Sequence, residues 1–369
     1  MNDNPTSKAT PLESKHLNLT ARMVPFAGWS MPVQYADGII AEHVHTRTKV
    51  SLFDICHMGE FCVTGTEAAE ALDKIFPRAV ATQKVGTCRY NFLLTDNGTV
   101  IDDLIIYRMA EEEFYIVVNA GSKDADFARL RELLPESVVI VDESDDTAKL
   151  DLQGPLSADV LEKMGLSKSD LPSYYKWTKL ELVGMPVLLS RTGYTGELGF
   201  EIYLPANLAE NMWDAILAVD EVKPAGLGAR DTLRLEMGYP LYGHEMDLDT
   251  TPIEAGFGGM LKLDSERKFI GRKALTNIPP KKKLIGIQLE GRRTARSGAD
   301  VSLNGQHIGI VTSGAFSPTL ERSIALAYVS PDFEPGDGAM VDLAAGRGTI
   351  PGEVTTTPFH KNSTVRMEI

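Results

Sequence analysis

Hydrophobic and polar positions along the chain predict strands and helices in alternation. From residue 61 the order is a strand, a helix from Thr66 to about Phe76, strands at 90–94, 101–108 and 114–119, a helix at 123–134 and a strand at 138–141. A similar order returns at Leu150, with a strand, a helix opened by Pro155, strands at 180–183, 186–189 and 200–204, and a helix at 208–219. The pattern predicts two related α+β modules, each an antiparallel sheet with helices on one face.

The C-terminal part of the chain has a different pattern. Helical periodicity ends at the run from Pro279 to Lys283, and short strands follow, separated by the turn signals Asn304-Gly305, Ser317-Pro318, Pro335-Gly336 and Pro351-Gly352. Residues 284–369 are therefore predicted to form an antiparallel β-barrel or jelly-roll-like domain. We expect the preceding region, 1–278, to divide into two interwoven modules, roughly 1–55 with 145–278, and 56–144.

One predicted strand contains two adjacent acids. Residues 100–107 follow the turn signal at 96–99 and are hydrophobic on both sides of the pleat, which predicts the buried second strand of a hairpin. Asp102 and Asp103 point to opposite faces of this strand. Because a lone buried carboxylate is costly, at least one acid needs a partner or a polar cavity. The alternative is structural: one acid accepts backbone N–H bonds at a strand bend, and the other meets solvent at a sheet edge.

The glycine-rich stretch 191–201 is a second candidate. Its three glycines permit close backbone approach to a ligand and present Tyr194 on a loop. Glu201 follows on a strand, where its carboxylate could accept two parallel hydrogen bonds from an amidine-like edge such as that of a pterin. The alternative is an outward Glu on a half-exposed strand.

A third candidate is residues 226–238, which predict a glycine turn followed by a helix that ends at a glycine. Arg230 lies in the first turn, where a cation is unfavourable against the helix dipole. An anionic ligand such as a glutamyl tail would explain its position. The alternative is an ion pair with Asp231 or a nearby Glu.

Composition and charge exclude several other functions. The net charge of −14 and the pI near 5.0 argue against a general nucleic-acid or anionic-membrane binder. No apolar run could span a bilayer and the opening residues resemble no targeting peptide, so we expect a cytoplasmic protein. The three cysteines lack Cys-x-x-Cys spacing, so we expect reduced thiols and no metal site. Residues 226–231 lack the third glycine of a dinucleotide fingerprint, and no flavin or nicotinamide domain is expected.

Taken together, these stretches closely resemble the glycine cleavage system T-protein family, the tetrahydrofolate-dependent aminomethyltransferases. The resemblance extends from about Thr10 to about Pro358. It is carried by the segments 25–32 (PFAGWSMP), 52–60 (LFDICHMGE), 101–104 (IDDL), 117–120 (VVNA), 152–155 (LQGP), 193–197 (GYTGE), 226–236 (GLGARDTLRLE) and 311–314 (VTSG). Two segments, 255–263 and 291–296, depart from the family pattern.

The resemblance implies a three-domain, cloverleaf-like α+β chain around a central folate channel. It implies that Asp103 is the catalytic aspartate and that tetrahydrofolate, as co-substrate, contacts Tyr90, Tyr107, Asn119, Tyr194, Glu201 and Arg230, with Met58 on a loop close to the channel. The implied reaction takes the aminomethyl group from the lipoyl arm of a partner, the lipoylated H-protein. It releases ammonia and leaves the one-carbon unit as 5,10-methylene-tetrahydrofolate.

Two other functions remain as alternatives. The same fold serves folate-dependent demethylases, which take a methyl group from a small sulfonium or amine and would keep the folate residues while changing the donor side. A non-enzymatic alternative is the folate-binding assembly factor for iron–sulfur proteins. That family carries a Lys-Gly-Cys-Tyr/Phe-x-Gly-Gln-Glu signature, which this sequence lacks.

Overall fold

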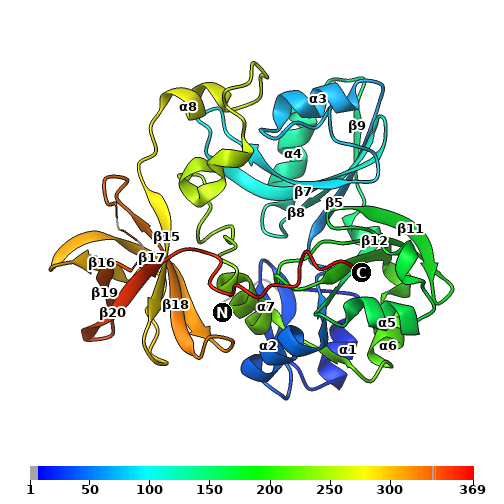
Figure 1. Ribbon diagram of the computed structural model, residues 1–369. Helices are drawn as coiled ribbons and strands as arrows, with labels where there is room; N and C mark the ends of the chain where they lie inside the picture. Colours follow the sequence, from blue (N-terminus) through cyan, green and yellow to red (C-terminus); the bar gives the residue numbers. More distant parts are fainter. Residues whose placement is uncertain (1–6, 335, 337) are drawn as a thin grey trace, which may run out of the picture.

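Three lobes surround a common centre in the computed structural model (Figure 1). The structure describes residues 7–334, 336 and 338–369. The opening residues 1–6, together with 335 and 337 at the predicted Pro335-Gly336 turn, lie outside the described residues. Two lobes combine an antiparallel or mixed sheet with helices and the third is a closed barrel, which confirms the predicted α+β fold class.

The first lobe is built on a six-stranded sheet whose strands come from distant parts of the chain. Its order is β11 (Trp177–Leu182), β12 (Met185–Ser190), β13 (Gly199–Pro205), β10 (Thr147–Gln153), β4 (Val50–Asp54) and β14 (Val222–Pro224). The helices associated with it are α1 (Glu13–Asn18), α2 (Ile39–Thr48), α5 (Ser157–Lys163), α6 (Ala209–Leu217) and α7 (Leu227–Glu236). Trp213 of α6 packs with Phe200 and Leu150 in the largest core, so the amphipathic helix covers one face of the sheet.

The second lobe carries the predicted hairpin in a five-stranded sheet. The order is β6 (Cys88–Leu94), β7 (Val100–Ala110), β8 (Glu113–Val118), β5 (Gly59–Thr64) and β9 (Val139–Asp142), with helices α3 (Ala68–Ile75) and α4 (Lys123–Leu133). β6 and β7 pair in antiparallel register, with Phe92 opposite Asp103 and Tyr90 opposite Ile105. The predicted strands and helices of this lobe are confirmed, with boundaries shifted by a few residues.

The third lobe is a closed antiparallel barrel, as predicted. Around the barrel the strands are β15 (Lys283–Leu289), β18 (Arg322–Val329), β17 (Gln306–Ser317), β16 (Asp300–Leu303), β19 (Met340–Ala345) and β20 (Gly348–Thr355). Small and branched side chains such as Ala325, Ala327 and Val311 fill its interior. Short α8 (Arg272–Asn277) precedes it.

Several elements were missed by the pattern of the sequence. A three-stranded sheet joins β1 (Lys8–Ala9), β3 (Trp29–Gln34) and β2 (Arg22–Phe26), and prolines inside the latter two strands weaken their strand signal. Short 3₁₀-helices occur at Ser144–Asp146, Lys168–Asp170, Ala206–Leu208 and Gly258–Met260, and a π-helical turn at Ile253–Phe257. Phe257, in a segment that departs from the family pattern, packs against Tyr90 and Phe92 of β6.

The chain leaves the barrel and returns to the first lobe. In Figure 1 the red C-terminal segment crosses from β20 past α7 to the region of β12. Leu198 N–H donates to Thr364 Oγ1 at 2.8 Å, and Val365 N–H donates to Gly196 O at 3.1 Å. The C-terminal segment thereby fixes the glycine loop that carries Tyr194.

Among the described residues, no helix combines the length and the apolar character needed to cross a membrane.

Candidate active site

Asp103 occupies the middle of β7 and is only partly exposed. Tyr90 Oη donates to its Oδ2 at 3.0 Å, and Asn119 Nδ2 donates to its Oδ1 at 3.0 Å. Tyr90 comes from the neighbouring strand β6, and Asn119 follows the end of β8. Three residues named by the family resemblance therefore form one hydrogen-bonded group.

Asp102 lies on the opposite face of the same strand and is fully buried. It accepts the Asn119 backbone N–H at 3.0 Å and Asn119 Nδ2 at 2.8 Å. This matches one half of the structural alternative, because one acid does take a backbone N–H bond. The other half is wrong: Asp103 does not face open solvent at a sheet edge, since β7 lies between β6 and β8.

The surroundings of Asp103 favour its neutral form. Burial, and then the negative charge of Asp102, raise its pKa to about 7, although the bonds from Tyr90 and Asn119 act in the opposite direction. Near neutral pH this carboxyl group is therefore poised between its charged and protonated forms. Such a value is typical of a group that takes part in chemistry rather than in an ion pair.

Glu201 is buried on β13, so the expectation of an outward side chain is wrong. Thr192 Oγ1 and Tyr203 Oη donate to its Oε2 at 2.8 and 3.0 Å, and Lys149 Nζ lies 3.3 Å from the same atom. Burial acts to raise its pKa, but the charge of Lys149 and the hydroxyl donors outweigh it, and the pKa of Glu201 lies below its ordinary value. Glu201 is therefore an anion at neutral pH.

Tyr107 and Met58 both contact the second group of side chains, which is centred on Glu201 and includes Tyr203 and Lys149. The Tyr107 hydroxyl on β7 lies 2.9 Å from that of Tyr203 and 3.4 Å from Glu201 Oε2. Met58 Sδ lies 3.5 Å from Lys149 Nζ. Tyr107 therefore links the sheet of the second lobe to that of the first.

Lys149 and Asp151 are two charged residues of this region that the sequence reasoning missed. Both are buried on β10, where they alternate with the hydrophobic residues Ala148, Leu150 and Leu152. β10 is a central strand of the sheet and lies between β13 and β4. Charged residues inside an apolar strand drew attention to Asp102 and Asp103 in the sequence. The same pattern could have identified Lys149 and Asp151.

Arg230 and Tyr194 form a third group. Arg230 Nη1 lies 2.8 Å from Asp151 Oδ2, and its guanidinium lies over the Tyr194 ring, 5.0 Å from the centroid. Tyr194 in turn stacks on Tyr239. An ion pair was one alternative for Arg230, but the expected partner is wrong, because Asp231 pairs with Arg234 and not with Arg230.

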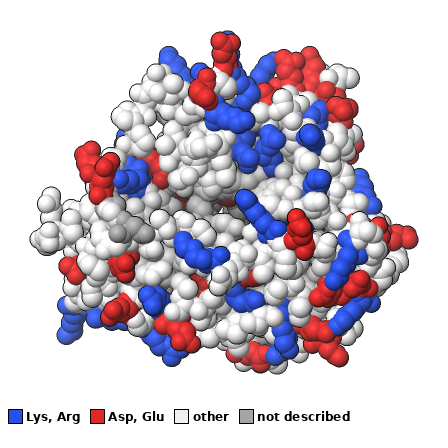
Figure 2. Space-filling view, viewed as in Figure 1, with Lys and Arg blue, Asp and Glu red and all other residues white. Residues whose placement is uncertain are grey.

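Two buried polar atoms near these groups have no hydrogen-bond partner in the described part of the protein. His57 Nδ1 and Glu60 Oε1 are buried and have no hydrogen-bond partner among the described residues. Both side chains lie close enough to Lys149 to feel its charge. Unsatisfied buried polar atoms are rare in proteins, so their presence near Lys149 fits a site that receives a polar ligand. Figure 2 shows a hollow in the middle of one face, with Lys and Arg side chains around it.

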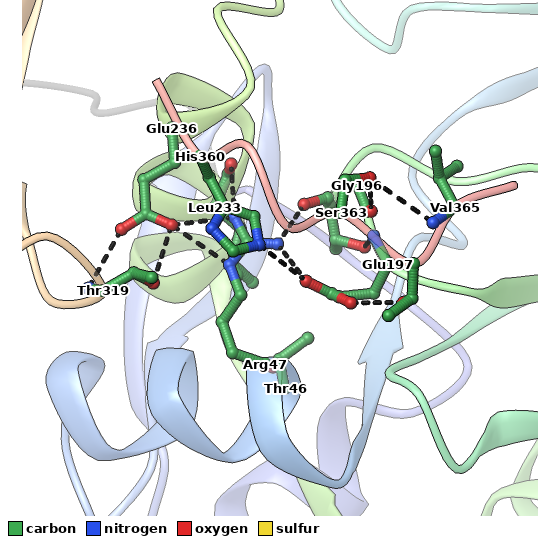
Figure 3. A network of polar contacts seen from close by, with 12 residues as sticks. Thr46, Arg47, Gly196, Glu197, Leu233, Glu236, Thr319, His360, Ser363 and Val365 are labelled. Carbon is green, nitrogen blue, oxygen red and sulfur yellow. Dashed lines mark hydrogen bonds and ion pairs between the residues drawn. The ribbon is translucent and has the colours of Figure 1, made fainter. Parts of the chain in front are cut away.

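Three charged residues fix the segments that carry Arg230 and Tyr194. We call Arg47, Glu197 and Glu236 the clamp (Figure 3). Arg47 Nη1 lies 2.7 Å from Glu197 Oε1, and Nη2 lies 2.9 Å from Glu236 Oε2. Glu197 belongs to the glycine loop, and Glu236 ends the helix that begins near Arg230. The clamp therefore fixes the two segments that carry Tyr194 and Arg230.

Within the described residues no group of three or more His, Cys, Asp or Glu side chains is placed to hold a metal ion. The polar side chains in the three groups are hydroxyl, amide and cationic donors together with carboxylate acceptors. These suit an organic ligand with several N–H and carbonyl groups, held by hydrogen bonds.

Comparison with known proteins identifies the family. Residues 12–265 match a family model described as the GCVT N-terminal domain, and residues 282–361 match the glycine cleavage T-protein C-terminal barrel domain. An aminomethyltransferase from Halothermothrix orenii is 43% identical over 358 residues, covering 95% of this chain and 99% of that protein. One from Symbiobacterium thermophilum is 43% identical over 373 residues, covering 97% and 99%.

A solved structure agrees with these matches. The crystal structure of glycine cleavage system aminomethyltransferase T from Bartonella henselae superposes with a TM-score of 0.90 at 35% identity, covering 96% of this chain and 98% of that one. Both lobes and the barrel are thus shared along nearly the whole length. The chain belongs to the glycine cleavage T-protein family of aminomethyltransferases.

Proposed function

We propose that this aminomethyltransferase moves a one-carbon unit from the aminomethyl-lipoyl arm of H-protein to tetrahydrofolate, with release of ammonia and formation of 5,10-methylene-tetrahydrofolate. The observation that carries the proposal is the environment of Asp103: a partly exposed carboxyl group held by Tyr90 and Asn119, with a pKa near 7. Family membership supports the reaction type, and the three groups of side chains support the substrate class.

Reduced folate supplies the nitrogen nucleophiles that accept the carbon. The residues that would hold it are Glu201 for the amidine-like edge of the pterin, with Tyr107 and Met58 beside it, and Arg230 for the anionic tail. The anionic state of Glu201 favours this role, because a carboxylate accepts two parallel hydrogen bonds from such an edge. When a ligand carboxylate binds, Arg230 would either release Asp151 or bond to both carboxylates.

In this proposal Asp103 acts through its charge. Positive charge develops on the transferred carbon as the carbon–sulfur bond to the lipoyl arm breaks, and a fixed carboxylate nearby stabilises it. Tyr90 and Asn119 orient the carboxylate, so little reorganisation is needed. The charged form is then the active form, and turnover should rise with pH through the pKa of Asp103. Proton transfer by Asp103 remains a separate hypothesis.

The decisive assay supplies lipoylated, aminomethyl-loaded H-protein and tetrahydrofolate and measures released ammonia. We expect stoichiometric ammonia and 5,10-methylene-tetrahydrofolate. The matched control is H-protein that carries lipoate without the aminomethyl group, which should yield none. Absence of ammonia with the loaded carrier, together with methyl transfer from a small sulfonium or amine, would instead establish the demethylase. The predicted cytoplasmic location is tested by fractionation of cells that express the tagged chain.

A further inference from the structure

A third acid lies behind the Asp102 and Asp103 pair. Asp126 on α4 is fully buried, and neither of its carboxyl oxygens has a hydrogen-bond partner among the described residues. Its carboxyl group lies within hydrogen-bonding reach of that of Asp102. We call Asp102, Asp103 and Asp126 the acid cluster. None of the interactions assigned above to catalysis or folate binding uses Asp126.

The protonation of Asp126 follows from what surrounds it. A buried carboxylate without any donor, next to a second carboxylate, is too costly to persist as an anion. The Ser122 hydroxyl lies near both acids, but it donates to Asn119 O at 3.3 Å. Two carboxylates can only accept hydrogen bonds, whereas a protonated carboxyl also donates. A proton on Asp126 is therefore the arrangement that gives Asp126 a hydrogen-bond partner.

Asp102 is the acid that keeps its charge in this arrangement. It accepts two hydrogen bonds from Asn119, one from the backbone and one from the side chain, whereas Asp126 accepts none. A proton on Asp126 would give Asp102 a third donor. The same Asn119 amide also bonds to Asp103, so the three acids are connected through one side chain and one proton.

We propose that Asp126 is a protonated positioning residue that donates a hydrogen bond to Asp102 and thereby keeps Asp102 charged beside Asp103. The negative charge of Asp102 is one of the two influences that bring Asp103 to neutral pH. Burial and the charge of Asp102 also raise the pKa of Asp126 to about 10, which agrees with a retained proton. Asp126 thus sets the pH at which the Asp103 carboxylate forms, without touching a substrate.

Other titratable groups face the cluster, and all of them are phenols. They are Tyr90 on β6, Tyr194 on the glycine loop, and Tyr242 on the segment after α7. Burial raises the pKa of Tyr90, Tyr194 and Tyr242 above the ordinary phenol value, so they stay neutral near pH 7. The strongest influences on the pKa values of the three acids are burial, neighbouring carboxylates and hydrogen bonds, and none of these comes from a cation.

The kinetic test compares Asp126→Asn with Asp126→Leu in the full chain. An Asn side chain donates to Asp102 through its amide, so we expect the pH profile of ammonia release to match that of the unmodified protein. A Leu side chain cannot donate, so Asp102 loses charge, the pKa of Asp103 falls, and the acidic limb of the profile moves to lower pH by about one unit. The matched control is Asp124→Asn, an exposed acid on the same helix, which should leave the profile unchanged.

An infrared measurement tests the proton itself and does not depend on turnover. The difference spectrum between the unmodified protein and Asp126→Asn, recorded at pH 8 where Asp103 is mostly ionised, should contain the carbonyl band of a protonated carboxyl group. A spectrum without that band overturns the proposal, as does a folded Asp126→Leu protein with an unchanged acidic limb. If the Leu variant does not fold, the infrared result decides alone. Because the kinetic arm rests on the proposed function, the infrared arm separates failure of this inference from failure of that function.

Discussion

The clamp and the acid cluster both bury carboxylates, but their partners differ. In the clamp, Arg47 bonds to both Glu197 and Glu236, and His43 Nε2 lies 3.1 Å from Glu236. Burial acts to raise the pKa of Glu236, yet the hydrogen bond from His43 and the charge of Arg47 lower it to about 2. In the acid cluster, the strongest influences that oppose burial are hydrogen bonds from neutral groups, and the pKa values of all three acids lie above their ordinary values.

The difference separates structure from chemistry within one protein. A carboxylate paired with a buried cation is ionised at every physiological pH, and the ion pair holds two segments of the chain together. A carboxylate without a cation changes its charge near neutral pH and can respond to a positive charge that appears during a reaction. The clamp should therefore control stability, and the acid cluster should control turnover.

The largest expected effect is on turnover, from Asp103→Asn. The amide keeps the shape of the side chain and its contacts but removes the negative charge, so we expect ammonia release to fall by about 10³-fold. The affinity for tetrahydrofolate, measured by fluorescence titration, should change by less than about threefold, since Glu201 and Arg230 carry the binding in the proposed site.

The control for this prediction lies on the same hairpin. Asp96→Asn alters an exposed acid in the turn between β6 and β7 and should leave turnover unchanged. An Asp103→Asn protein with turnover close to that of the control would remove Asp103 from the mechanism.

The second largest expected effect is a loss of stability caused by Arg47→Met. This change leaves Glu197 and Glu236 buried without their common cation, and breaking such a pair costs about 3 kcal/mol or more of the free energy of unfolding. Urea unfolding followed by circular dichroism measures the loss. Arg47→Lys, which keeps the charge but not the planar fork, should lose less.

An exposed ion pair provides the comparison for the clamp. Lys74 pairs with Glu70 on α3, where both side chains are largely exposed. Lys74→Met should leave the unfolding midpoint unchanged. If Arg47→Met and Lys74→Met unfold at the same urea concentration, the clamp does not have the stabilising role assigned to it.

Local patterns predicted most helices and strands, but the partners of the polar residues lie far away in the sequence. The acids at 102 and 103 stood out because they interrupt an apolar strand. Lys149 and Asp151 interrupt β10 in the same way, and the same reasoning would have found them. Asp151 could not have been assigned to Arg230 from the sequence, because 79 residues separate them and only the fold brings them together.

Other parts of the site left no local signal at all. Arg47 looks like an ordinary polar residue at the end of a helix, yet it joins segments near 197 and 236. Asp126 looks like a favourable acid in the first turn of α4, and only its burial against β7 distinguishes it from exposed Asp124. Burial of a polar helix face depends on what the rest of the chain places over it.

The smallest expected effect is on the pH dependence of stability, a measurement in which the clamp and the acid cluster can be compared directly. The pKa of Asp103 is about 7 in the folded protein and about 3.9 when unfolded, so the folded state holds the extra proton between these values. Stability from this group therefore falls as the pH rises from about 4 to about 7. Asp103→Asn removes that loss, so its stability relative to the unmodified protein should be about 2 to 3 kcal/mol higher at pH 8 than at pH 5.

Glu236→Gln should behave differently in the same urea titrations. The pKa of Glu236 is about 2 when folded and about 4.3 when unfolded, so its contribution is present above about pH 4 and is lost only as the pH falls toward 2. The variant should therefore be destabilised by the same amount at pH 5 and at pH 8. A pH-dependent loss in Glu236→Gln, or a pH-independent effect in Asp103→Asn, would contradict the division between a permanently charged clamp and a titrating cluster, because that division depends on where each carboxyl group exchanges its proton.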